Sequence, residues 1–368
     1  MERISADLAD GKQVFVRFPE NPPKRFKTYL KEKWLENDGF EWRELQLQYL
    51  DQEADHPAKL IYDIYLPDAP PDTVHNAANL AREPDFRNMI IWVEGLTPER
   101  WPAWNEFFYE FSEFSRNRPP EDRIRFLILL DGTLSGCQPK ISLITSVRDW
   151  AGTVDRLSMM LYCTALVRDR RMSILQRRLM AELVACLALW DQNLADYLIQ
   201  QKLEDLLEPN DLLYDFAREL NWNENTEESW PAGTINAFEN KNLVHSACLV
   251  AKGREQDIRR RVWQAQLSVL FPVIEELRHA LIDHLGDHLT VPFTDEKGRL
   301  ITDRTEMEVG HIYYQLRNNS KGDHPLRKQV GYLRDLRNHL AHMDPVPKDK
   351  FHLIENVEVL LENLSTTH

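Results

Sequence analysis

The first 150 residues alternate short apolar runs with amphipathic stretches. Residues 89–93 and 125–130 are almost continuously apolar, as is typical of strands buried on both faces. Residues 13–18 form another β-rich run, and residues 60–66 alternate with a period of two. A helical spacing of aromatic side chains follows at 101–115. Weaker patterns predict a helix at 25–35 and a strand at 141–144. This alternation predicts an α/β domain over 1–150 with a mostly parallel sheet.

The chain changes character near residue 149, where strand patterns give way to long helical ones. Residues 221–233 and 290–305 interrupt the helices, and a turn is expected at 295–298. We therefore predict all-α regions after the first domain: a helical linker region over 151–253 and a helical domain over 254–368. The expected helices cover residues 153–167, 173–199, 211–220, 254–285, 306–317, 326–341 and 351–364.

The formal net charge of −14 limits which partners the protein can attract. A globally acidic protein gains no long-range attraction to nucleic acid, which counts against a general nucleic-acid binder. It does not count against a nuclease with a small local site. Two arginine clusters could contact phosphates or could simply form solvated helix faces, and the second interpretation is favoured. They are Arg168, Arg170, Arg171, Arg177 and Arg178, and Arg254, Arg259, Arg260 and Arg261.

Metal and redox chemistry find little support in the sequence. The four cysteines show no CxxC spacing, so neither a zinc ribbon nor a redox dithiol is indicated. His284 and His288 are one helical turn apart, but a third ligand at a suitable spacing is missing, and a surface pair is favoured over a metal site. We expect no metal and no cofactor. Residues 1–10 are acidic, and the longest apolar run is too short to span a bilayer, so we expect a cytoplasmic protein without membrane contact.

A phosphate-binding loop would be expected after the first strand of such a domain. It needs glycines whose backbone N–H groups face the phosphates, but residues 18–26 contain no glycine and three prolines. Lys24 lies near the place of a phosphate lysine, and Glu20 would repel phosphate. Glu94 and Asp131 at strand ends could serve a magnesium ion, although turn and cap roles are favoured. The order of elements resembles a degenerate P-loop domain of the STAND-like class, which implies a regulatory or scaffolding role without nucleotide hydrolysis.

The most informative stretch is residues 336–342, Leu-Arg-Asn-His-Leu-Ala-His, at the end of an expected helix. Val330, Leu333, Leu336 and Leu340 form its apolar stripe, while Arg337, Asn338 and His342 lie off it. An arginine and a histidine can bind a phosphodiester and transfer a proton without a metal. The spelling Arg-Asn-x-x-Ala-His resembles the Arg-x4–6-His motif of HEPN domains, which are small helical bundles common in prokaryotic defence and toxin systems.

This resemblance, covering about 254–368, implies a catalytic pair of Arg337 and His342 with Asn338 as the polar residue beside the arginine. His339 occupies a variable position of the motif. The implied function is a defence- or toxin-associated, metal-independent endoribonuclease regulated by the inactive nucleotide fold. The resemblance also implies a homodimer or a HEPN-containing partner, an RNA substrate and other defence-system proteins as partners. The alternative is a non-catalytic scaffold or dimerisation subunit of a prokaryotic antiviral defence complex.

Overall fold

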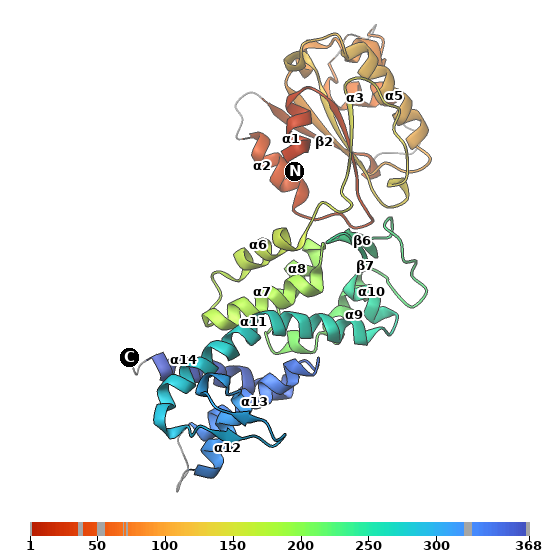
Figure 1. Ribbon diagram of the computed structural model, residues 1–368. Coiled ribbons are helices and arrows are strands. Elements are labelled where there is room, and N and C mark those ends of the chain that lie inside the picture. The colour runs from red at the N-terminus through yellow and green to blue at the C-terminus, as the bar shows by residue number, and fades with distance from the viewer. Residues whose placement is uncertain are drawn as a thin grey trace. The chain divides into compact units, whose positions relative to one another are not determined.

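The chain divides into two compact units that differ in architecture. A computed structural model describes residues 2–35, 40–49, 56–68, 70, 73–319 and 326–365. One unit comprises residues 1–153 and 227–243, and the other comprises 154–226 and 244–368. The first is built on a sheet and the second mostly on helices (Figure 1). The expected boundary at residue 150 lies close to the observed one, whereas the helices on both sides of residue 253 belong to one compact unit.

The sheet of the first unit has the strand order β2-β3-β4-β1-β5, and every neighbouring pair is parallel among the described residues. Parallel strands need crossover connections, and helices supply them between the first four strands. The prediction of an α/β domain with a mostly parallel sheet is confirmed. The strands are β1 Gln13–Arg17, β2 Glu41–Gln46, β3 Met89–Glu94, β4 Arg125–Leu130 and β5 Thr145–Asp149.

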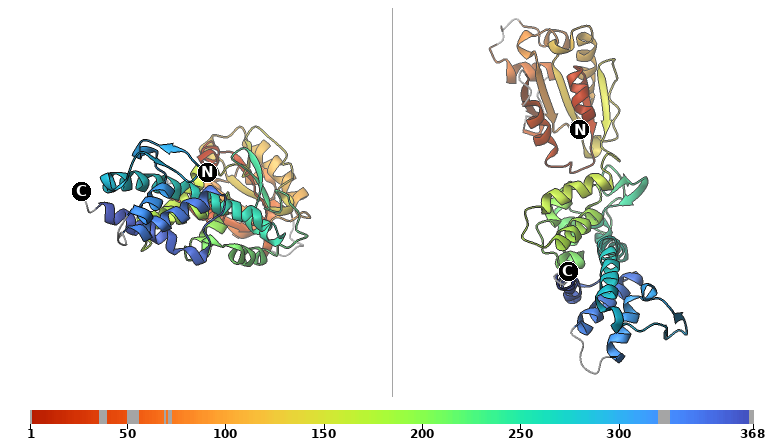
Figure 2. Two further views of the ribbon diagram at one scale, coloured as in Figure 1. Left: turned by 60° about the horizontal axis from the view of Figure 1, so that its bottom comes forward. Right: turned by 60° about the vertical axis from the view of Figure 1, so that its left-hand side comes forward.

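Helices cover both faces of this sheet, as two views show (Figure 2). On one face, Phe126 of β4 packs against Phe108, with ring centroids 5.4 Å apart. On the other, Trp92 of β3 packs against Phe26 at 5.9 Å. Because both faces are covered, β3 and β4 have almost no polar side. The helices of this unit are α1 Glu2–Ala9, α2 Phe26–Leu35, α3 Pro57–Tyr65, α4 Ala77–Leu80 and α5 Trp101–Ser115.

The second unit is organised around the long helix α11, Glu255–Leu285, which packs on α7, α13 and α14. A buried stripe that includes Ile258, Val262 and Leu270 lies along α11 and explains this central position. A short antiparallel hairpin, β8 Phe293–Thr294 with β9 Leu300–Ile301, confirms the expected turn. The other helices are α6 Arg156–Val167, α7 Ile174–Ala188, α8 Gln192–Leu198, α9 Asn210–Glu219, α10 Ser246–Ala251, α12 Val309–Asn319, α13 Arg327–Ala341 and α14 His352–Ser365. None of the described helices has the length and apolar character needed to cross a membrane.

The strand predicted at residues 60–66 is wrong, because this segment belongs to helix α3. Pro57 starts the helix, and the His56 side chain accepts a hydrogen bond from the backbone N–H of Ala58. Ala58, Ile61 and Tyr62 are buried, which is a helical spacing. A seven-residue apolar run fits both periods, and the capping residues before it decide the outcome.

Three further predictions differ from the structure in detail. The last strand covers 145–149 instead of 141–144. The helix expected at 173–199 is interrupted between α7 and α8, where Leu189 adopts a left-handed φ of 56° and Asp191 caps α8. Strand β2 and the hairpin of β6 Ile235–Phe238 and β7 Lys241–Val244 were not predicted. These strands are short or polar, so the period of hydrophobic positions does not reveal them.

Candidate functional site

Helix α13 presents the Arg-Asn-x-x-Ala-His segment at its C-terminal end. The predicted apolar stripe is confirmed, since Val330, Leu333, Leu336 and Leu340 are buried. His342 is the C-cap residue and donates its backbone N–H to the carbonyl of Asn338 at 3.1 Å. The next residue, Met343, has a left-handed φ of 59°, and Pro345 follows. The chain therefore leaves the helix at once and keeps the last turn open to solvent.

The three predicted site residues line one groove. Arg337, Asn338 and His342 border a hollow of about 580 Å³ between α13, α12 and the β8–β9 hairpin. Arg337 is half-buried, whereas Asn338 and His342 are exposed. Within the described part of the chain, the His342 imidazole makes no hydrogen bond, so its ring nitrogens are available to a ligand. The arrangement thus brings together a cation, an amide and an imidazole without a protein partner on the imidazole.

The groove has more cations than carboxylates on its walls. Arg337 donates to the Glu308 carboxylate at 3.1 Å. Arg334 lies over the ring of Tyr313, 4.1 Å from its centroid, and pairs with Asp335. A local basic surface of this kind can hold an anion although the whole chain is acidic. The cationic residues lining it are Lys297, Arg299, Arg317, Arg334 and Arg337, and the acidic ones are Asp295, Glu296 and Glu308.

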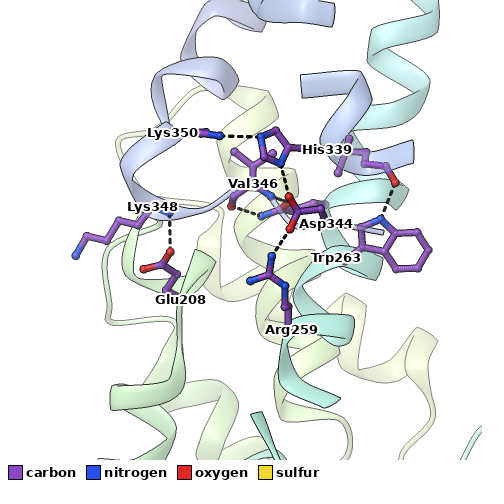
Figure 3. A network of polar contacts seen from close by, with 10 residues as sticks. Glu208, Arg259, Trp263, His339, Asp344, Val346, Lys348 and Lys350 are labelled. Atoms are coloured by element: carbon purple, nitrogen blue, oxygen red, sulfur yellow. Dashed lines mark hydrogen bonds and ion pairs between the residues drawn. The ribbon is translucent and has the colours of Figure 1, made fainter. Parts of the chain in front are cut away.

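Sequence reasoning missed the role of His339, which lies in a connected polar network (Figure 3). Its Nδ1 lies 2.8 Å from Oδ2 of Asp344, and its Nε2 lies 3.1 Å from Nζ of Lys350. Asp344 is also paired with Arg259 of α11. The one signal in the sequence is an acidic residue, Asp344, five positions after this histidine. The network fixes the segment that follows the motif.

Further contacts hold the same segment against α11. The Gln266 side chain donates to the carbonyl of Val346 at 3.0 Å and accepts from its N–H at 2.7 Å. The Trp263 indole donates to the carbonyl of Leu340 at 2.7 Å (Figure 3). Gln266 and Val346 are fully buried. The last turn of α13 and residues 344–347 are therefore positioned by hydrogen bonds from two residues of the long helix.

The arginine clusters found in the sequence serve largely structural contacts. Arg170 donates to the backbone carbonyls of Ile199 and Gln201. Arg261 is half-buried and donates to the backbone carbonyl of Val244, and its partial burial lowers its pKa to about 10. For these two residues the contacts to backbone carbonyls differ from the solvated helix face favoured from the sequence. Among the described residues, three or more histidine, cysteine or acidic side chains nowhere gather as a metal site would require.

The carboxyl ends of the strands in the first unit gather acids instead of phosphate-binding groups. Burial raises the pKa of Asp131, and the carboxylates of Glu94 and Glu20 raise it further. Lys27 lies 2.8 Å from a carboxylate oxygen of Glu94 and 2.8 Å from one of Glu44. In open α/β sheets this edge is where ligands bind. Here the local charge opposes a polyphosphate.

No family model matches this chain, and a comparison with curated proteins found no similar sequence.

Proposed function

We propose that this chain is a metal-independent endoribonuclease. In this proposal the C-terminal helices act as a HEPN-type module, and the N-terminal α/β unit regulates it without nucleotide hydrolysis. The single observation that carries the proposal is the groove that Arg337, Asn338 and His342 share. Three groups suited to phosphodiester chemistry line one groove that is open to solvent, and the imidazole among them is accessible to a ligand.

The proposed reaction transfers the phosphate to the neighbouring ribose hydroxyl. Neutral His342 takes the proton of the RNA 2′-hydroxyl, whose oxygen forms a new bond to phosphorus. The bond from phosphorus to the 5′-oxygen breaks, which leaves a 2′,3′-cyclic phosphate and a 5′-hydroxyl. Arg337 stabilises the charge that builds on the non-bridging oxygens through two parallel N–H groups. Asn338 adds an uncharged donor that can orient the phosphate.

The charges of the groove support an RNA substrate. Lys297, Arg299, Arg317 and Arg334 extend the cationic surface away from Arg337 and could follow a sugar–phosphate backbone. Tyr314, on the same wall, is 39% exposed and offers a ring on which a base could stack. An RNA strand would thus be attracted locally by a protein that repels nucleic acid elsewhere.

The biological setting follows from the same resemblance and is part of the proposal. HEPN-type ribonucleases pair two modules across one cleft, so we propose a homodimer or a HEPN-containing partner within a prokaryotic defence or toxin system. The acids at the strand ends of the first unit support a regulatory domain that recognises something other than a nucleoside triphosphate.

The test compares the full-length chain with His342→Ala and Arg337→Ala on single-stranded and transfer RNAs in EDTA. Wild type should cut, and His342→Ala should be slower by about 10²- to 10⁴-fold, as expected on losing a general base. Exposed Glu355 of α14 supplies a matched control, since Glu355→Gln should cut like wild type. Equal rates for wild type and both site variants would contradict the proposal that this site is a ribonuclease.

The ion pair between Arg337 and Glu308 favours a second candidate, a non-catalytic scaffold that dimerises through its helices. A guanidinium already neutralised by a carboxylate could serve structure alone. The same RNA assay separates the two functions, because a scaffold predicts no cleavage by any variant while light scattering still detects a dimer.

A further inference from the structure

A second groove lies beside the first and meets it at the end of α13. It measures about 450 Å³ and is lined by residues that include Tyr332, His339, Lys350 and His352. Asn338 and His342 line both grooves. His342 therefore borders both the groove that contains Arg337 and the groove that contains Lys350. The motif itself accounts only for the first of these.

The hydrogen bonds of the second groove have a defined direction. An ammonium group can only donate, so Lys350 donates to Nε2 of His339 across 3.1 Å. Nε2 is then the acceptor of a neutral imidazole, and Nδ1 carries the hydrogen that points to Asp344 at 2.8 Å. The pairing of Asp344 with Arg259 completes the row (Figure 3). Two carboxylates line this groove and each has an arginine partner, Asp344 with Arg259 and Asp335 with Arg334, which leaves the charge of Lys350 in excess.

The geometry points to a residue for the second half of the reaction. Cleavage removes a proton from the 2′-hydroxyl, and the departing 5′-oxygen must gain one. Arg337 cannot supply it, because a guanidinium is not deprotonated in proteins. Resting on the proposed ribonuclease function, we propose that Lys350 protonates the leaving 5′-oxygen and that His339 is the positioning residue that holds it.

The proton balance closes within the site. Lys350 gives one proton to the 5′-oxygen as the bond from phosphorus to that oxygen breaks, while His342 holds the proton taken from the 2′-hydroxyl. The neutral amine of Lys350 and the imidazolium of His342 then return to their starting forms by exchange with water. An alkoxide is far more basic than an amine, so the transfer to the leaving oxygen is downhill. Among the described residues, His339 alone accepts a hydrogen bond from this ammonium group, so its other two protons can face a substrate.

The test uses two oligonucleotides with one scissile ribonucleotide each, one with the natural 5′-oxygen and one with sulfur in that bridging position. A thiolate leaves without a proton donor. Lys350→Met should therefore lose about 10²- to 10⁴-fold on the oxygen substrate and stay within about fivefold of wild type on the sulfur substrate. His342→Asn should be slow on both. The neighbouring Lys348, which pairs with Asp205, provides the matched control, since Lys348→Met should leave both rates unchanged.

His339 has its own readout. His339→Gln places an amide oxygen near the position of Nε2 and should keep much of the oxygen-substrate rate, whereas His339→Leu should follow Lys350→Met, including its rescue by sulfur. A merely structural histidine would slow both substrates alike.

The possible results separate this inference from the function on which it rests. Cleavage of both substrates by wild type, with Lys350→Met equal to wild type or equally slow on both, would overturn the role of Lys350 and leave the ribonuclease intact. Failure of wild type to cut either substrate would remove the ribonuclease and the role of Lys350 with it.

Discussion

The proposed ribonuclease chemistry depends on how a few single polar side chains are held at the end of α13. Arg337 is paired with Glu308, His339 with Asp344 and Lys350, and His342 is open to solvent. Arg337 and His339 are held by these partners, whereas the His342 imidazole is open to solvent, as expected of a group that takes a proton from a substrate. Two substitutions test how this region is held.

Glu308→Gln should speed cleavage, because it releases Arg337 from a competing carboxylate. The pair is substantially exposed, with side-chain exposures of 31% and 56%, so its worth lies below about 1 kcal/mol. The expected gain in kcat/KM is accordingly up to about fivefold. Steady-state kinetics on a fluorescent RNA checks it, with Glu355→Gln as the charge-matched control. A loss of activity would mean that Glu308 orients Arg337 instead of blocking it.

Gln266→Leu should destabilise the protein by about 1–3 kcal/mol, since it leaves the buried N–H and carbonyl of Val346 without partners. Urea unfolding measures the difference. Gln256→Leu is the matched control, the same substitution at an exposed position of the same helix, with an expected change within about 0.5 kcal/mol. Equal stability of the two variants would show that Gln266 does not anchor the segment after the motif.

At the scale of elements, α1 is tied to the sheet through one buried carboxylate. Asp7 accepts from Lys12 at 2.9 Å and from Ser146 and Arg148 of β5, each at 2.7 Å. Burial alone would raise the pKa of Asp7, but these three partners outweigh it and lower the pKa below its ordinary value of 3.8. The ionised side chain therefore joins a helix, a turn and an edge strand.

Asp7→Asn should cost about 1–2 kcal/mol of stability at pH 7. Because the folded state lowers the pKa, the contribution is present above the unfolded value and disappears as pH falls through the folded one. The gap between wild type and variant should thus be full at pH 7 and shrink below about pH 4. Thermal unfolding across pH checks this, with exposed Asp10→Asn as control. A gap that does not change with pH would contradict it.

Long elements with a clear period could be predicted from the sequence, and short ones could not. The apolar stripe of α13 and the buried runs of β3 and β4 show their packing directly in the residues. Residues 60–66 predict a strand although helix α3 covers most of them, because so short a run fits both periods. Polar β2 lies at the sheet edge, where its pairing with β3 comes from tertiary context.

Some residues of the candidate site could likewise be predicted from the sequence, and others could not. Arg337, Asn338 and His342 were found because they are close together in the chain. The contacts of His339 could not be predicted, because its partners Asp344 and Lys350 are brought to it by the fold. Asp344 is in turn paired with Arg259, which lies 80 positions before His339. Such a network depends on how α11 packs against α13, which no local pattern reports.

At the scale of the whole molecule, the chain combines an α/β unit whose strand ends are acidic with a helical unit whose groove is cationic. The net charge of −14 hides this difference. This separation of charge agrees with the proposal that the helical unit binds RNA and that the α/β unit binds no polyphosphate.

Isothermal titration calorimetry with MgATP and MgGTP should give no binding heat at 25 °C, because Glu20, Glu94 and Asp131 oppose a polyphosphate and residues 18–26 lack glycine. Titration of single-stranded RNA into His342→Ala, as the positive control, should give a salt-dependent signal. Clear nucleotide binding would contradict the proposal that the first unit recognises something other than a nucleoside triphosphate.

The most direct measurement follows an RNA oligonucleotide and its copy with one 2′-deoxynucleotide at the mapped cut, incubated in EDTA with wild type and His342→Ala. Wild type alone should cut, only where the 2′-hydroxyl is present, and should leave a 2′,3′-cyclic phosphate. Cleavage of the deoxy copy, a requirement for Mg²⁺, or an unchanged rate in His342→Ala would contradict the proposed mechanism.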